Sequence, residues 1–184
     1  MIDHVTIRVP DLDVARSFYA LSFELLAFRG EPFESDGFVE WNDFSLAQES
    51  EDRPATRGLH VGLRAESPAV VDAWWQAMTR AGYEDDGPPG PRPAYGPGYY
   101  GGFVVDPAGN SVEAVNNGPR RQEGVIDHLW LRTRSLDDAT RFYEAVCPAV
   151  AHSVERYPGR TQIRGDGATF SIVSGRPTKN VHLA

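Results

Sequence analysis

The chain has 184 residues, of which 41% are hydrophobic, with a formal net charge of −8 and a pI near 5.1. This is enough apolar sequence for one or two small cores. The acidic balance argues against nucleic acid and anionic membrane surfaces as partners, because both need a basic protein face. Cys147 is the only cysteine, so no intrachain disulfide can form. With no apolar run of the ~18 residues that span a bilayer and no signal-peptide pattern, the sequence predicts a soluble cytoplasmic protein.

An internal repeat organises the chain. Residues 2–9 alternate apolar and polar side chains, and residues 126–133 repeat that stretch. Each copy is followed by a polar turn and a helical pattern that carries a Phe-Tyr pair. Residues 58–64 open a further unit with the same alternation, and residues 180–184 resemble that opening. We therefore expect repeated units and the start of a fourth at the end of the chain.

These units define the expected domain organisation. The predicted boundaries are residues 1–55 and 56–118, which together form one domain, a linker at 119–124, and a third unit at 125–184. Local signals support helices after each opening strand, with Asp11, Ser67 and Ser135 as N-caps. Residues 84–98 are rich in proline and glycine, which favours a long loop that is either a functional lid or a mobile segment.

Histidines recur on the polar faces of the opening strands. Four of the five occupy an equivalent position, namely His4, His60, His128 and His182. A polar strand face that carries histidine, threonine and arginine is costly in a dry core and typical of a wet pocket. Glu113 adds a carboxylate on a closing strand. A single histidine or strand glutamate is more often structural or solvated, but two imidazoles and one carboxylate form a facial triad that suits iron(II) or manganese.

The unit order and its motifs resemble the vicinal oxygen chelate superfamily, which includes glyoxalase I, extradiol dioxygenases, thiol transferases and bleomycin-binding proteins. The most specific match is the run Asp-Pro-Ala-Gly-Asn-Ser-Val-Glu at residues 106–113. The resemblance implies an α+β fold in which two βαβββ modules pair into a cupped, eight-stranded, partly open barrel. The third module is then unpaired or truncated.

The resemblance also implies a site. Its metal ligands would be His4, His60 and Glu113, around Fe²⁺ or Mn²⁺, with Zn²⁺ or Ni²⁺ as alternatives. Glyoxalase I has a fourth ligand on the last strand of the first module, where residues 44–48 offer no carboxylate. This difference favours a dioxygenase-like or thiol-transferase-like arrangement.

Further positions take roles from the same resemblance. The catalytic candidates are Thr6 and Tyr100. The substrate-binding candidates are Arg8, Arg64, Tyr95, Tyr99 and Trp41. Packing of the tyrosines and solvent exposure of the arginines are the alternative interpretations. His128 and His182 would form a second metal half-site, completed by a missing fourth module or by another chain in a homodimer.

The sequence thus predicts a divalent-metal enzyme that acts on a small oxygen-rich substrate, either dioxygenase-like or glyoxalase- and lyase-like. The first alternative is a protein of the bleomycin-resistance type that sequesters a drug or metabolite. Its net charge of −8 and the aromatics Trp41, Tyr95, Tyr99 and Tyr100 would suit a cationic planar ligand. The second alternative is a thiol transferase of the fosfomycin-resistance type.

Overall fold

The computed structural model describes residues 3–118, 124–165 and 169–184. Its helices and strands, in chain order, are β1 Val5–Val9, α1 Leu12–Leu25, β2 Phe33–Ser35, β3 Phe38–Trp41, β4 Phe44–Gln48, β5 His60–Arg64, α2 Pro68–Arg80, β6 Asp85–Pro91, β7 Tyr99–Val105, β8 Ser111–Asn117, β9 Ile126–Thr133, α3 Leu136–Val146, the 3₁₀ turn η1 Cys147–Val150, β10 Ser153–Tyr157, β11 Arg160–Arg164, β12 Thr169–Ser174 and β13 His182–Leu183. The predicted linker, apart from Gly124, and the first residue of the predicted opening stretch lie outside the described residues.

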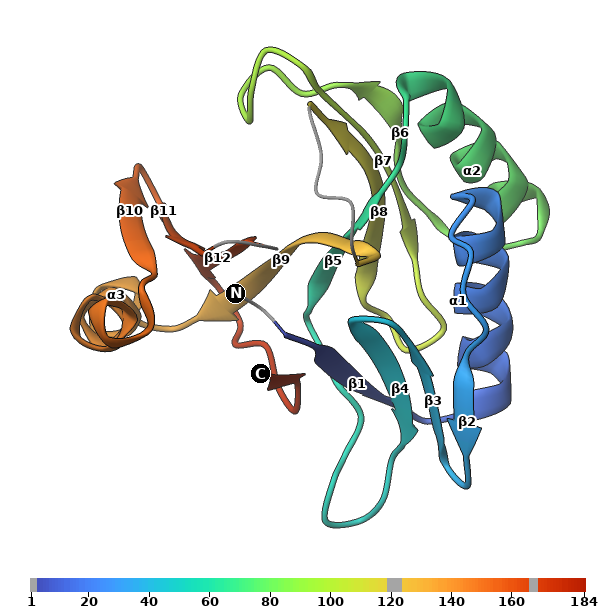
Figure 1. The fold of residues 1–184 in the computed structure, drawn as a ribbon, viewed down its shortest axis with the longest axis horizontal. Coiled ribbons are helices and arrows are strands. Elements are labelled where there is room, and N and C mark those ends of the chain that lie inside the picture. Colours follow the sequence, from blue (N-terminus) through green and yellow to red (C-terminus); the bar gives the residue numbers. More distant parts are fainter. Residues whose placement is uncertain (1–2, 119–123, 166–168) are drawn as a thin grey trace.

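Two open sheets form the framework of this α+β fold (Figure 1). The first has five strands in the order β13-β1-β4-β3-β2, and the second has eight in the order β10-β11-β12-β9-β5-β8-β7-β6. Helices α1 and α2 lie side by side on one side of the molecule, whereas α3 stands apart beside β10 and β11 (Figure 1). The predicted α+β class is confirmed, and a strand, a helix and three strands follow one another in β1 to β4, β5 to β8 and β9 to β12.

The pairing of modules differs from the sequence-based expectation. The eight-stranded sheet joins the second and third modules through antiparallel pairing of β5 with β9, rather than the first and second modules. The first module instead extends its sheet with β13, which pairs antiparallel with β1. Each opening strand has the same alternation and one edge free for pairing, so the sequence pattern does not select which two edges meet.

The helix starts follow the predicted capping residues. The side chains of Asp11, Ser67 and Ser135 accept hydrogen bonds from the backbone N–H three residues later. Pro68 occupies the first turn of α2, where its missing N–H would have no helical partner. Local sequence is sufficient here because each cap is satisfied within its own turn.

Strand β6 is a correction to the predicted loop at residues 84–98. Its residues pair antiparallel with β7, with register shifts around Gly87. Three prolines are tolerated in β6 because it is the last strand of the sheet and needs no donors on its outer side. Only the part after Pro91 remains a loop before β7 begins at Tyr99.

Apolar faces of both sheets pack under α1 and α2. Phe18, Tyr19 and Trp74 are fully buried between these helices and the strands. The Trp74 indole N–H donates to Ser22 Oγ at 2.6 Å, which ties α2 to α1. In the described part of the chain, no helix has the length and hydropathy of a bilayer span. The core therefore occupies the helix-covered side, and the polar strand faces are left to form the site.

Candidate metal centre

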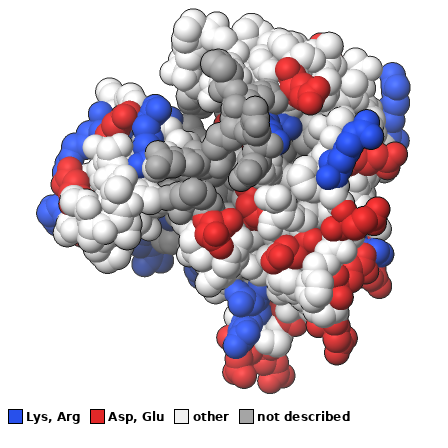
Figure 2. Space-filling view, in the orientation of Figure 1, with Lys and Arg blue, Asp and Glu red and all other residues white. Residues whose placement is uncertain are grey.

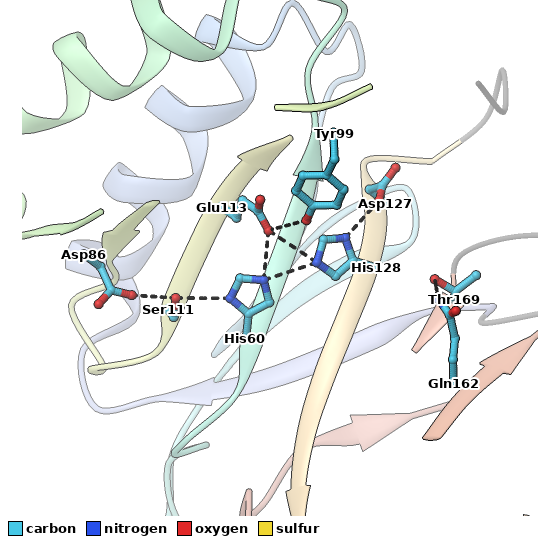
Figure 3. A network of polar contacts seen from close by, with 9 residues as sticks. All are labelled: His60, Asp86, Tyr99, Ser111, Glu113, Asp127, His128, Gln162 and Thr169. Carbon is cyan, nitrogen blue, oxygen red and sulfur yellow. Dashed lines mark hydrogen bonds and ion pairs between the residues drawn. The ribbon is translucent and has the colours of Figure 1, made fainter. Parts of the chain in front are cut away.

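Three side chains meet on the polar face of the eight-stranded sheet. His60 opens β5, Glu113 lies on β8 and His128 lies on β9. Gly62 of β5 pairs with Glu113 on one side and with His128 on the other. His60 is two residues before Gly62, so strand alternation places its side chain on the same face. The site therefore depends on the pairing of the second module with the third (Figure 3).

The donor atoms of this group form a small triangle. His60 Nε2 lies 3.1 Å from Glu113 Oε2 and 3.2 Å from His128 Nε2. His128 Nε2 lies 3.4 Å from the same carboxylate oxygen. Ligands about 2.1 Å from one divalent ion are separated by roughly 3.0–3.4 Å in octahedral or tetrahedral geometry. The spacing of the three atoms therefore fits a single metal ion.

Two further features fit a metal. Glu113 Oε1 is buried without a hydrogen-bond partner in the described structure, which is costly for a carboxylate unless another group completes it. Gly62 and Gly101 also leave space around the ligands. A Cβ at Gly62 would overlap the His128 ring, and a Cβ at Gly101 would overlap Glu113 Oε1. Only glycine at these positions allows the three side chains to converge.

Outer hydrogen bonds orient both imidazoles (Figure 3). His128 Nδ1 lies 2.9 Å from Asp127 Oδ1. Ser111 Oγ donates to Asp86 Oδ2 at 2.6 Å, which leaves the serine oxygen to accept from His60 Nδ1 at 3.1 Å. In both rings Nδ1 is engaged and Nε2 faces the carboxylate, which is the orientation needed by a metal ligand.

Electrostatics within the group are strong. Burial would raise the pKa of Glu113, but the hydrogen bonds and charges of His128 and His60 outweigh it and lower that pKa to about 2. Burial would likewise lower the pKa of His128, but Asp127 and Glu113 raise it to about 9. Burial lowers the pKa of His60. In the metal-free protein an ionised Glu113 and a protonated His128 therefore form an ion pair.

An aromatic pocket of about 210 Å³ opens from the three ligands. Its walls include Tyr95, Phe103 and Trp130, and the Tyr95 and Trp130 rings meet edge to face at 5.6 Å. Arg132 contributes a guanidinium group to the lining. A small, flat and largely apolar ligand with a few oxygens would match this lining.

Comparison with known proteins identifies the group to which the chain is related. Residues 1–114 match the family described as Glyoxalase/Bleomycin resistance protein/Dioxygenase superfamily. The chain belongs to this superfamily. Glyoxalase I from Zea mays aligns with a TM-score of 0.65 and 16% identity over 99% of this chain and 71% of that chain. A glyoxalase/bleomycin resistance protein from Albidiferax ferrireducens aligns with a TM-score of 0.55 and 27% identity over 64% and 99%. No curated protein matches the sequence.

The group of three side chains differs from the predicted ligand set at a single position. The structure brings together His60 and Glu113, but their third partner is His128 and not His4. His4 lies beside the five-stranded sheet, where its ring centroid is 5.3 Å from that of His182. The predicted half-site at His128 and His182 is thus divided between the two sheets.

The His4 region repeats the strand geometry of the superfamily site without its carboxylate. Thr6 pairs with His182 as Gly62 pairs with His128. The partner of Thr6 on β4 is Ser45, which takes the place of Glu113. The Thr6 and Ser45 hydroxyls share a hydrogen bond of 2.8 Å. Thr6 therefore lies on the other sheet from His60, Glu113 and His128, and its side-chain hydrogen bond is to Ser45.

The predicted tyrosines separate into two groups. Tyr99 donates to Glu113 Oε2 at 2.9 Å and Tyr95 lines the pocket, so both belong to the site. Tyr100 points to α2 instead, where its hydroxyl donates to Asp72 Oδ1 at 2.8 Å. Adjacent strand residues face opposite sides of a sheet, so Tyr99 and Tyr100 cannot both reach one pocket.

The remaining predicted residues lie elsewhere. Trp41 is buried in the core against Phe23, with ring centroids 5.2 Å apart. Arg8 lies on β1 of the five-stranded sheet. Arg64 lines a separate cavity of about 590 Å³ with Phe28 and other residues.

Sequence reasoning missed the third-module side of the pocket. Trp130 and Arg132 follow His128 at two-residue intervals on β9, so the alternation used for the other opening strands could have identified them. Asp127 and Ser111 carry no comparable signal, because their role depends on neighbours in space.

Proposed function

We propose that the protein is a divalent-metal-dependent enzyme of this superfamily that acts on a small oxygen-rich substrate. His60, Glu113 and His128 would hold the ion. The observation that carries the proposal is the triangle of donor atoms 3.1–3.4 Å apart, on three strands contributed by two modules. Two imidazoles and one carboxylate favour Fe²⁺ or Mn²⁺, with Zn²⁺ or Ni²⁺ as alternatives.

A bound ion would supply Lewis acidity toward two neighbouring substrate oxygens. The chain's own residues would prepare the site. Tyr99 fixes the Glu113 carboxylate through its hydroxyl, while Asp127 and Ser111 fix the two imidazoles. The aromatic walls at Tyr95 and Trp130 would exclude water and orient a flat substrate.

The number of protein ligands bears on which type of reaction the enzyme would catalyse. Three protein ligands leave positions for substrate and resemble the set used by non-haem iron(II) oxygenases. A dioxygenase-like reaction is therefore our first choice, ahead of a glyoxalase- or lyase-like isomerisation.

We also propose that the protein is cytoplasmic and forms a homodimer. Cell fractionation tests the location, and analytical sedimentation tests the oligomeric state.

The test is metal content by elemental analysis of untagged protein, with His128→Ala and His4→Ala as a matched pair. We expect about one equivalent of metal per chain in the wild type, loss in His128→Ala, and retention in His4→Ala, because only His128 lies within reach of His60 and Glu113. The two variants remove the same side chain from equivalent positions of the repeat.

No metal in the wild type after reconstitution with iron(II), manganese and zinc would overturn the proposal. The aromatic pocket would then favour the ligand-sequestering alternative, whose ligand affinity should be unaffected by chelator. Loss of metal in His4→Ala but not in His128→Ala would restore the ligand set expected from the sequence.

A further inference from the structure

A second, basic pocket lies next to the aromatic one. It has a volume of about 720 Å³, and its cationic side chains are Arg57, Arg132, Arg176 and Lys179. None of its described lining residues is acidic. This is unexpected for a chain of net charge −8, in which acidic residues outnumber basic ones.

Two of the cations of this basic pocket are held close together by the backbone. Arg57 and Lys179 form an antiparallel bridge, with N–H to C=O distances of 3.2 and 3.0 Å in the two directions. Residues directly opposite each other in an antiparallel pair project to the same face, and like charges in that arrangement repel. None of the four cations forms a salt bridge within the described residues. An anion in the pocket would relieve this repulsion.

Two of the guanidinium groups are partly fixed. Arg57 Nη1 donates to Ala108 O at 2.6 Å, and Arg132 Nη1 donates to Gly58 O at 3.0 Å. Each has remaining N–H groups for a ligand, and a planar guanidinium matches the oxygens of phosphate and carboxylate. Glycines at positions 58, 109 and 175 also line the pocket, so a ligand can approach the backbone closely.

Charge and position connect this basic pocket to the metal centre. Arg132 lines both pockets. Residues 125–184 contain eight Lys and Arg against six Asp and Glu, whereas residues 1–124 contain ten against twenty. Figure 2 shows the acidic residues gathered mainly away from the third module.

We propose that the pocket formed by Arg57, Arg132, Arg176 and Lys179 binds an oxyanion, either phosphate or carboxylate. The anion has two possible sources. It is either the charged end of a substrate whose two neighbouring oxygens reach the metal centre, or a separate free anion. The oxyanion site itself does not depend on the proposed function, whereas its assignment to the substrate does.

The first experiment titrates inorganic phosphate into chelator-treated, metal-free protein by isothermal titration calorimetry at low ionic strength. We expect one binding site whose affinity falls about tenfold or more in Arg176→Ala/Lys179→Ala, because charge-assisted hydrogen bonds are lost. The control is Arg141→Ala/Arg164→Ala, which removes two cations from the same module at exposed ion pairs with Asp138 and Glu155. Its affinity should stay within about twofold of the wild type.

No phosphate binding, or an equal loss in both double variants, would overturn the proposal and leave only general electrostatic attraction. The second experiment compares phosphate with 3-phosphoglycerate, which adds a carboxylate and a hydroxyl on neighbouring carbons. If metal loading raises the affinity for 3-phosphoglycerate but not for phosphate, and Arg176→Ala/Lys179→Ala abolishes this increase, the pocket holds the charged end of the substrate. If metal loading changes the affinity for neither ligand, the pocket binds a free anion.

Discussion

Gly101 gives the Glu113 carboxylate the space it occupies in the metal centre, because glycine has no Cβ. A Cβ there would overlap Glu113 Oε1, a buried oxygen that already lacks a partner among the described residues. Tyr99 holds the other oxygen of the same carboxylate. The carboxylate therefore cannot swing away easily, because one of its oxygens is tied and the other has only the space above Gly101.

We predict that Gly101→Ala lowers the affinity for divalent metal by at least about tenfold, because the added methyl group displaces a ligand from its position. Competition titration against a chromophoric chelator measures this affinity. Gly98→Ala is the control, since a Cβ at Gly98 meets no atom within 4 Å. Equal affinities in wild type and Gly101→Ala would show that Glu113 is not a ligand. Circular dichroism of both variants separates loss of the ligand from unfolding.

At the scale of elements, two connecting segments hold the modules together, each through the hydroxyl group of one threonine. Thr56, in the connection before β5, accepts from Arg8 N at 3.0 Å and donates to Asn180 O at 2.8 Å. Thr178, in the connection before β13, accepts from Arg132 N at 2.9 Å and donates to Gly58 O at 2.8 Å. Each threonine hydroxyl satisfies a strand N–H and a carbonyl of another segment.

We predict that Thr56→Val lowers the free energy of unfolding by about 2 kcal/mol and Thr178→Val by about 1 kcal/mol, because valine leaves both backbone groups without their partner. The difference arises because Thr56 is fully buried, while Thr178 is partly open to water. Urea denaturation of the two variants gives both values. A larger loss in Thr178→Val than in Thr56→Val would contradict the proposed role of burial.

Local and non-local elements differ in how well sequence predicts them. The helix caps at Asp11, Ser67 and Ser135 and strand β4 follow from patterns within a few residues. The pairing of β5 with β9 does not, because four opening strands carry the same histidine and alternation. His60 and Glu113 could be predicted as partners, since they lie within one module. His128 could be recognised as a candidate ligand, but only the fold shows which carboxylate it meets.

At the scale of the whole molecule, the metal centre also links modules of different charge. Glu113 belongs to the second module and His128 to the third, and their ion pair crosses the β5–β9 boundary. Burial opposes both charges, but the hydrogen bonds and charges of His128 and His60 lower the pKa of Glu113 to about 2, and those of Asp127 and Glu113 raise the pKa of His128 to about 9. The Glu113–His128 pair contributes to both shifts, so its contribution to stability is counted once.

The direction in which the free energy of unfolding changes with pH follows from the raised pKa of His128. Its pKa is raised from 6.5 to about 9 on folding, so its contribution is complete below pH 6.5 and disappears as the pH rises through 9. We predict that metal-free protein loses roughly 3 kcal/mol of unfolding free energy over this range. Urea denaturation in chelator at several pH values measures the loss. His128→Gln, which cannot carry the charge, should show a flatter profile over the same range. If wild type and His128→Gln have parallel profiles, the charge that His128 carries between Asp127 and Glu113 does not stabilise the fold.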